Sequence, residues 1–507
     1  MNISRGKKLA LNTVTSMLLQ IVTVVCGFIL PRLILGSFGS DVNGLVNSIG
    51  QFLGIIALLD FGVAGVARSN LYKPLAENDN DMISRIYVSS AKFFRKIAYL
   101  FLAYVMVLVV VYPLMVNDKY GFGFTATLIG ALFISSFIQY YFGIVNNILL
   151  TADQKEYLSN TISIITIILN TAACAILIKL GASIQIVKLT TSLIYVLRPV
   201  FLMIYVRKNY KINTKITYTE EPIKQKWNGM AVHFSYYVLE STDNMVLTAF
   251  STLANVSIYS VYNMVIIGVK NVIASMSKGF TSLMGDMLAK NETEKLKSFF
   301  SYVEWFYHTG TTLLFGCTGI LLLPFIRVYT DGVNDAKYIQ PLFCVLITAA
   351  NAIHTLRSPY NMAIQAAGHY KQTQNNYISA TILNIVVSVA TVKLWGLIGV
   401  SIGTLAAMTY QTIWMARYNS KKIIKWPFKQ FIKQCFVDVI TVLIASLATF
   451  KIPLLSISYK AWVIQAVEVF ACWLVIVCII NYFFYKDKLM YIFNRIKTMV
   501  NKSKKDI

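Results

Sequence analysis

The chain has 507 residues, of which 56% are hydrophobic and only 13% are charged, whereas soluble domains carry about 25% charged residues. This composition and a mean hydropathy of +0.61 exclude a soluble protein of this length. The formal net charge is +24, so the charges that remain are mostly basic. Apolar runs recur along the chain, each long enough to cross a bilayer. They are continuous, unlike the short alternating segments of a transmembrane β-barrel, so the sequence predicts an all-α polytopic membrane protein.

The first apolar run, residues 9–33, follows Arg5, Lys7 and Lys8 and superficially resembles a secretory signal peptide. It is too long for the apolar part of a signal peptide and lacks a small-residue cleavage site, so we interpret it as a retained first span. Further runs bring the expected total to about 14 transmembrane helices. Their expected ranges are 9–33, 42–67, 93–116, 123–150, 158–180, 184–206, 229–251, 254–284, 300–324, 339–365, 373–393, 396–418, 432–451 and 460–485.

Lysine and arginine are distributed unevenly about these spans. Of the 46 basic residues, 33 flank the spans on the side of the two termini, 9 lie on the opposite side and 4 fall inside spans. Cytoplasmic loops carry such an excess, so both termini are expected in the cytoplasm. Basic residues at span ends also meet anionic lipid head groups. The net charge therefore predicts membrane lipids as partners, and no nucleic acid.

An internal duplication relates the two halves of the chain. The segment IILNTAACAILIKLGA (167–182) matches TILNIVVSVATVKLWG (381–396), so that Asn170 corresponds to Asn384, and the loop AENDND (76–81) matches AKNETE (289–294) at nearly the same offset. This offset maps spans 1–6 onto spans 7–12. Six is even, so both halves have the same orientation and form a parallel repeat. Two such lobes can rock about a central cavity, which is the architecture of a transporter.

The repeat also predicts the domain organisation. An N-terminal lobe of spans 1–6 and a C-terminal lobe of spans 7–12 are joined by a polar, basic linker, and spans 13 and 14 follow with a basic cytoplasmic tail. The expected ranges are 1–206 for the first lobe, 207–228 for the linker, 229–418 for the second lobe and 419–507 for the remainder.

Charged residues inside the spans are the candidates for function, since such residues generally face a bundle interior or a wet cavity. Glu240 and Asp243 lie on one face of span 7 because they are three residues apart. The repeat offset places them close in depth to Arg32 of span 1, and it places Lys270 four residues from Asp60. We expect a polar chamber shared by these charges; a purely structural ion pair between the lobes is the alternative.

A second polar group is expected in NAIHTLRSPYNMA (351–363). Pro359 breaks the helix and frees carbonyl groups, and His354 and Arg357 lie one turn apart on one face. An intramembrane histidine is either a proton carrier or a hydrogen-bonded structural residue. The seven scattered cysteines form no CxxC pair and the four histidines show no metal-ligand spacing, so neither a metal site nor a disulfide framework is expected.

The fourteen spans with cytoplasmic ends, the stretch ALLDFGVAGVARS (57–69) and the pattern STDNMVLTAF (241–250) resemble the Wzx-type polysaccharide flippases. These proteins belong to the multidrug/oligosaccharidyl-lipid/polysaccharide (MOP) exporter superfamily. The resemblance covers the whole chain through topology and repeat. It implies a MATE-like fold of two lobes plus two C-terminal helices. It also implies that undecaprenyl-pyrophosphate-linked oligosaccharide units move by alternating access from the cytoplasmic to the outer leaflet of a bacterial cell membrane, for surface polysaccharide biosynthesis.

An anionic, membrane-anchored substrate requires cations in a cavity open to lipid, and Arg and Lys donate charge-assisted hydrogen bonds to phosphate. Arg32, Lys270 and Arg357 are therefore the expected binding residues for pyrophosphate and sugar. Ion pairing, or coupling to a proton or sodium gradient, is expected of the remaining group, Asp60, Glu240, Asp243 and His354. No other cofactor is expected. A polysaccharide polymerase and its chain-length machinery stay open as partners.

Three alternatives remain. A lipid II flippase also has fourteen spans, whereas a drug/cation antiporter of the same superfamily usually stops at twelve. A membrane-embedded glycan polymerase or ligase would be an enzyme and would need a catalytic surface outside the membrane. The longest expected external connection is only about 325–338, and no compact acidic or histidine-rich cluster appears, so an enzyme is not expected.

Overall fold

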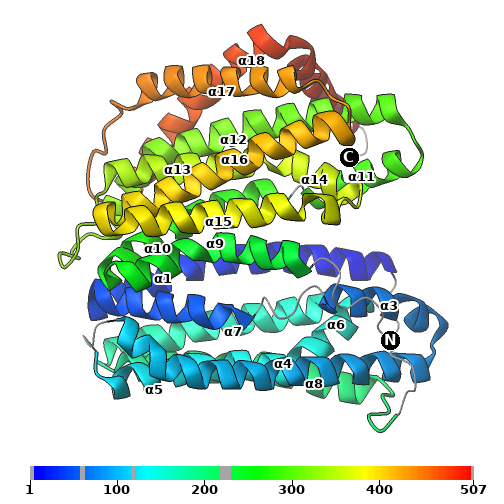
Figure 1. The fold of residues 1–507 in the computed structure, drawn as a ribbon, viewed down its shortest axis with the longest axis vertical. Helices are drawn as coiled ribbons and strands as arrows, with labels where there is room; N and C mark the ends of the chain where they lie inside the picture. The colour runs from blue at the N-terminus through cyan, green and yellow to red at the C-terminus, as the bar shows by residue number, and fades with distance from the viewer. Residues whose placement is uncertain (1–4, 57–62, 117–119, 217–229, 276, 504–507) are drawn as a thin grey trace. The chain divides into compact units, whose positions relative to one another are not determined.

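The computed structural model describes residues 5–56, 63–116, 120–216, 230–275 and 277–503. Regular secondary structure in these ranges is helical throughout, and Figure 1 labels the helices in chain order. The helices are α1 (Arg5–Gly54), α3 (Val63–Glu77), α4 (Asn80–Met115), α5 (Phe122–Ile138), the π-helix η1 (Gln139–Gly143), α6 (Ile144–Ala152), α7 (Glu156–Lys179), α8 (Ile184–Asn209), α9 (Met230–Phe250), α10 (Leu253–Ala274), α11 (Ser277–Ala289), α12 (Thr293–Tyr329), α13 (Pro341–Leu356), α14 (Ser358–Ala366), α15 (Tyr370–Trp395), α16 (Leu397–Lys422), α17 (Phe428–Thr449) and α18 (Tyr459–Ser503).

Each of the fourteen predicted spans coincides, over the part of the chain that the structure describes, with a helix or with successive helices. Within the described residues, ten helices are long and apolar enough by themselves to cross a membrane. The other predicted spans are divided between shorter helices or are less apolar: span 10, for example, consists of α13 and α14. The chain is a polytopic helical membrane protein, as its apolar runs predict.

Several spans are interrupted or irregular. Gly39 has φ 82° and ψ 177°, so α1 consists of two helical segments that correspond to span 1 and the first part of span 2. Span 10 is interrupted at Arg357, two residues before the predicted helix breaker Pro359. Span 4 contains the π-helix Gln139–Gly143, an irregularity that frequently marks a functional region.

The backbone repeats the duplication that the sequence predicts. Residues with positive φ stop helices at turns, and three pairs of them are separated by the repeat offset to within a single position. These pairs are Asn78 and Asn291, Gln154 and Gly368, and Gly181 and Gly396. The turns that end spans 2, 4 and 5 thus recur at the ends of spans 8, 10 and 11, which confirms the parallel repeat.

Contacts divide the chain into two compact units. Unit 1 contains residues 1–260 together with 333–336, and unit 2 contains residues 261–332 together with 337–507. Grouping by contact differs from grouping by repeat, so the predicted lobe boundaries at 207 and 229 remain predictions.

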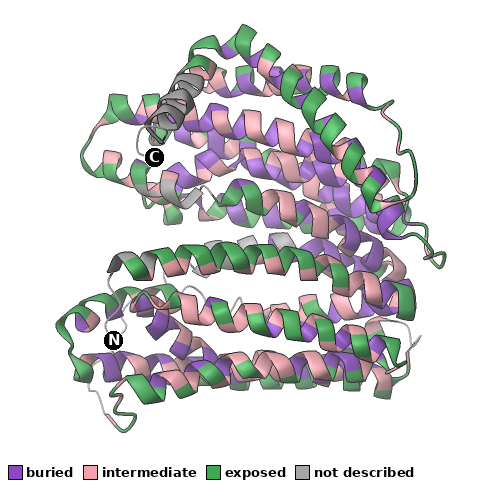
Figure 2. Cartoon of the chain, turned by 180° about the vertical axis from the view of Figure 1, so that it is seen from behind, coloured by how far each residue is buried: buried purple, intermediate pink, exposed green. Residues whose placement is uncertain are grey.

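Exposed and buried residues occupy different faces of the helices (Figure 2). Large apolar side chains remain exposed, including Met106 at 66% and Phe483 at 78%, and such surface is expected where helices meet lipid. The buried faces of the helices pack against neighbouring helices. In unit 2, Trp473 is fully buried against α12, where a methyl group on Gly316 would lie 1.9 Å from its ring. Close helix contacts in membranes depend on such small residues.

Candidate functional site

Buried polar side chains join the second segment of α1 to α9 and α10 in unit 1. Asn43 Nδ2 donates to Ser257 Oγ at 2.7 Å, and the hydroxyl oxygens of Ser48 and Thr248 lie 2.7 Å apart. All four residues are at most 5% exposed, and we call them the polar interlock. Asn43 and Ser257 are separated by the offset of the repeat. Positions that are equivalent in the repeat therefore contact each other, as they do at an isologous interface.

A second contact lies beside the polar interlock, at the kink of α1. The backbone N–H and the hydroxyl of Ser40 each donate to the carboxylate of Asp335 at 2.6 Å. The positive φ of Gly39 turns the chain so that both groups face this carboxylate. A methyl group on Gly44 would lie 1.9 Å from the carbonyl oxygen of Leu253, so glycine is needed for this close approach.

Two of the predicted charges lie in unit 1. Asp243 on α9 is 5% exposed and accepts a hydrogen bond of 3.1 Å from the Tyr259 hydroxyl of α10. Arg32 lies half-buried on the first segment of α1. Asp60 and the side chain of Glu240 lie outside what the structure describes, so their roles stay predictions.

The other predicted charges lie in unit 2. His354 and Arg357 contact each other at the interruption of span 10, as their spacing predicts, with Arg357 Nη2 2.6 Å from His354 Nε2. Arg357 is 3% exposed, and among the described residues its Nη1 atom has no hydrogen-bond partner. Lys270 is half-buried on α10. The polar chamber expected for Arg32, Asp243 and Lys270 would draw on both units and stays a prediction.

Unit 2 also contains a buried polar cluster that was not among the predicted site residues. His308 Nδ1 lies 2.5 Å from Asp438 Oδ2, and Thr312 donates to Asp438 Oδ1 at 2.8 Å. Glu304 accepts hydrogen bonds from the Tyr360 hydroxyl at 2.6 Å and from a tryptophan indole in the connection between α16 and α17 at 2.9 Å. Glu304 and His308 are both 0% exposed. The sequence indicates this cluster only through the spacing of Glu304 and His308, which lie one helical turn apart inside span 9. Their partner Asp438 lies far along the chain, in span 13.

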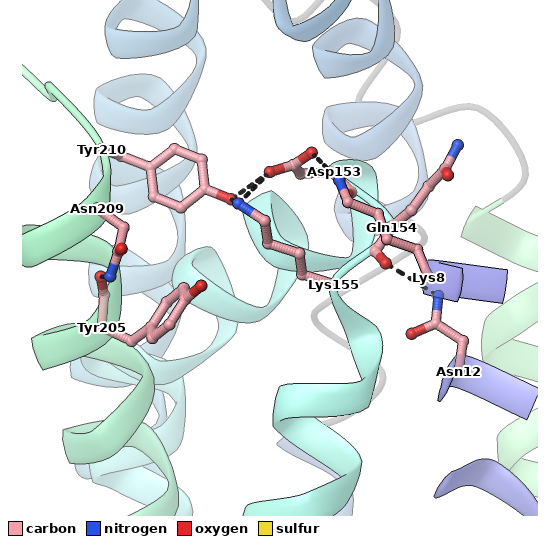
Figure 3. A network of polar contacts seen from close by, with 8 residues as sticks. All are labelled: Lys8, Asn12, Asp153, Gln154, Lys155, Tyr205, Asn209 and Tyr210. Carbon is pink, nitrogen blue, oxygen red and sulfur yellow. Dashed lines mark hydrogen bonds and ion pairs between the residues drawn. The ribbon is translucent and has the colours of Figure 1, made fainter. Parts of the chain in front are cut away.

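A network of ion pairs lies at the N-terminal end of the first α1 segment, the end away from the kink at Gly39 (Figure 3). Lys8 of α1 and Lys155 lie 3.0 Å and 2.7 Å from the carboxylate of Asp153, between α6 and α7. The Tyr210 hydroxyl, after α8, donates to the same carboxylate at 2.5 Å. Asn12 Nδ2 adds a hydrogen bond to the Gln154 carbonyl.

Asp153 and Tyr210 have shifted pKa values as a result. Burial by itself raises the pKa of Asp153, but hydrogen bonds from Lys155, Tyr210 and Lys8 outweigh it and hold the pKa below its ordinary value. Burial and the bond to the Asp153 carboxylate both raise the pKa of Tyr210. The network therefore favours an ionised Asp153 and a neutral Tyr210.

No protein-family model matches the sequence, and a search of curated proteins finds no match. The structure is similar to that of the lipid II flippase MurJ in an inward closed conformation, with a TM-score of 0.72 and 14% identity over 94% of this chain and 99% of that one. It is also similar to an inward-facing MATE family transporter of the MOP superfamily (TM-score 0.61, 16% identity, 79% of this chain and 94% of that one). A mutant of the Vibrio cholerae MATE transporter VcmN gives a TM-score of 0.57 at 12% identity over 82% of this chain and 98% of that one.

These similarities define the class of the protein as a multi-pass membrane protein with the MATE-like fold. At sequence identities of only 12–16%, these similarities support a conclusion about the fold alone. Within that fold, the chain resembles both the flippase and the multidrug transporters of the MOP superfamily.

Proposed function

We propose that the chain is a flippase for undecaprenyl-pyrophosphate-linked oligosaccharide units. It acts in a bacterial cell membrane with both termini in the cytoplasm, and it moves its substrate to the outer leaflet by alternating access, without covalent change. The observation that carries the proposal is the fold over nearly the full length: the flippase structure covers 94% of the chain, whereas the two MATE transporters cover 79% and 82%. This supports a flippase of fourteen spans over an antiporter of twelve.

A lipid II flippase is the second candidate, because the structure that covers 94% of the chain is itself named a lipid II flippase. Both candidate substrates carry a pyrophosphate and a polyprenyl chain, so they require the same cations. They differ in the sugar and peptide that the cavity must accept.

Arg357 supports the binding of an anion. A buried guanidinium with an unsatisfied nitrogen is unfavourable unless a ligand completes its hydrogen bonds, and Arg357 Nη1 is such a nitrogen among the described residues. A pyrophosphate oxygen accepts strong, charge-assisted bonds from guanidinium groups. Arg32 and Lys270 complete the proposed binding residues, with Asp60, Glu240, Asp243 and His354 as proposed ion-pair or coupling residues.

The polar interlock supports alternating access. Hydrogen bonds between transmembrane helices contribute about 0.6 kcal/mol each on average. The two bonds of the polar interlock therefore stabilise the contact of α1 with α9 and α10 only modestly. Hydrogen bonds of this strength can break and re-form within a transport cycle.

Depletion of the protein from its own host tests the proposal. We expect lipid-linked oligosaccharide to accumulate on the cytoplasmic leaflet while surface polysaccharide falls, and re-expression restores export. Re-expressed Arg32→Ala, Lys270→Ala or Arg357→Ala variants, at equal membrane levels, are expected to restore less than about a tenth of it. Accumulation of lipid II in place of the oligosaccharide favours the second candidate, and full export by all three variants contradicts the proposed binding residues.

A further inference from the structure

A line of polar groups runs through the interior of unit 2 between α12, α17 and α18. Along one face of α12 lie Ser301, Glu304, His308 and Thr312, at helical spacing. His308 and Glu304 are 0% exposed, and Asp438 of α17 keeps 14% of its side-chain surface. Ionisable groups in this setting are unfavourable without partners, and in membrane proteins they commonly mark proton or ion pathways.

One nitrogen of the His308 imidazole is hydrogen-bonded, and the other has no partner among the described residues. Nδ1 lies 2.5 Å from Asp438 Oδ2, so in the neutral ring Nδ1–H donates to the carboxylate. Among the described residues, Nε2 has no hydrogen-bond partner. In this tautomer Nε2 carries the lone pair, and it is the atom that accepts a proton.

The charges around His308 leave a deficit of one positive charge. Glu304 and Asp438 contribute two carboxylates, and Lys488 of α18, whose Nζ donates to the Ser301 carbonyl at 2.8 Å, contributes one half-buried ammonium. Lys433 of α17 is exposed at the rim, over the Tyr485 ring. One proton on His308 balances the buried charges, which a medium of low dielectric favours.

The neutral titratable groups that face the cluster complete its surroundings. They are Cys435 on α17, Tyr485 on α18 and Tyr360 on α14. Tyr360 donates to Glu304 at 2.6 Å and so holds that carboxylate in place. Phe431 packs edge to face against the His308 ring, with 6.1 Å between the centroids.

A small cavity borders Asp438. Its lining includes the hydroxyls of Thr309 and Thr312, the amides of Gln434 and Asn481, and the phenol of Tyr485. Its volume of about 10 Å³ is the minimum that holds one water molecule, and its lining supplies the polar partners that such a water needs. Helix α18 is kinked at Tyr485, one of the residues that line this cavity.

From this geometry we propose that the cluster of Glu304, His308 and Asp438 is a proton-binding site that couples the transporter to a proton gradient. Protonation places a proton on the Nε2 lone pair, with hydronium as the donor and water as the other product, and the imidazolium keeps its Nδ1–H bond to the Asp438 carboxylate; release is the reverse step. Gain or loss of this proton changes the attraction between α12 and α17. The coupling part of this inference rests on the proposed transport function.

The site differs from the coupling residues that the sequence predicts. It joins span 9 to span 13, which lies outside the twelve-span repeat, whereas His354 lies in span 10 against Arg357. Unit 2 by itself contains every group involved.

The full-length chain in liposomes, labelled with ¹⁵N-histidine, tests proton binding without any substrate. The sequence holds only four histidines, so His308→Gln assigns the His308 signal by its loss. We expect this signal to change from the neutral ring with Nδ1–H to the imidazolium when the pH is lowered across the range in which the protein stays folded. In Asp438→Asn, which retains an acceptor for Thr312, the proton binds more weakly because its counter-ion is lost. A His308 signal that keeps one protonation state across this range overturns the proposal.

A second arm tests coupling. Transport of the lipid-linked oligosaccharide into proteoliposomes is expected to accelerate at least about fivefold under an imposed pH gradient, and His308→Gln and Asp438→Asn are expected to lose this acceleration. The control His369→Gln, whose ring contacts Tyr418 outside the cluster, retains it. Acceleration that survives in both cluster variants, or that requires sodium in place of protons, overturns coupling at this site. Absence of any transport by the unaltered chain counts against the proposed function, and the histidine titration still decides proton binding.

Discussion

Asp153 connects three segments of unit 1 through one carboxylate. Its partners come from the start of α1, from the turn before α7 and from the residue after α8. A carboxylate that accepts several charge-assisted hydrogen bonds stabilises the folded state more than an exposed ion pair does. This distinction can be measured at single residues.

Replacing Asp153 by Asn removes the charge that Lys8 and Lys155 share. We expect the free energy of unfolding to fall by about 1–3 kcal/mol, since the side chain is only 24% exposed and its partners lose a charged acceptor. Thermal unfolding in detergent measures the loss. The control Asp286→Asn breaks an exposed pair between α11 and Lys290, the residue that follows this helix, and should leave stability unchanged; an equal loss in both variants contradicts a special role for Asp153.

The pKa of Asp153 also predicts a pH dependence. Because its pKa is lower in the folded chain than in the unfolded one, its stabilisation is complete above the unfolded value of about 3.9 and disappears as the pH falls through the folded value. The stability difference between the unaltered chain and Asp153→Asn is thus expected to stay constant between pH 7 and pH 5. It should shrink below about pH 4, and a difference that increases on acidification contradicts the assignment.

Between elements, the contact of Ser40 with Asp335 holds the kink of α1 against the connection from α12 to α13. Asp335→Ala removes an ionised acceptor from a backbone N–H, so amide exchange at Ser40 should increase about tenfold or more. Hydrogen–deuterium exchange of the peptides around residues 37–46 measures this. Asn334→Ala alters an exposed residue of the same connection and should leave their exchange unchanged; unaltered exchange in Asp335→Ala contradicts the contact's role.

The packing of α18 on α12 depends on one glycine. Gly316→Ala brings a methyl group to 1.9 Å from the Trp473 ring, so the tryptophan or the helix must move, and we expect a loss of about 1–3 kcal/mol. Gly319→Ala lies one turn further on the same helix, and its nearest neighbour is 3.8 Å away. That control should be neutral or slightly stabilising. Equal thermal stability of the two variants contradicts the predicted close contact.

For the whole molecule, the spans and the repeat could be predicted because each depends on local sequence. Apolar runs mark helices without knowledge of their neighbours, and the turns at Asn78 and Asn291 lie within matching polar loops. The contact between His354 and Arg357 was also local, because the two residues lie one turn apart on the chain.

The rest of the site depends on contacts between distant segments. Asp438 lies in an apolar run with nothing nearby to indicate that His308 is its partner. The polar interlock consists of Asn, Ser and Thr, which are common in membrane helices, and only the fold brings Asn43 to Ser257. The chamber expected for Arg32 and Lys270 likewise depends on how distant segments pack, and it stays a prediction.

The central claim is that this chain moves a lipid-linked, pyrophosphate-bearing oligosaccharide across a bilayer. Proteoliposomes that contain the purified full-length chain can be offered the undecaprenyl-pyrophosphate oligosaccharide, lipid II and an organic cation in parallel, with movement to the opposite leaflet or lumen measured for each. The account predicts that the oligosaccharide lipid moves at least about tenfold faster than in empty liposomes, ahead of lipid II, while the cation does not move. Transport of the cation alone, or no movement of either polyprenyl lipid, would contradict it.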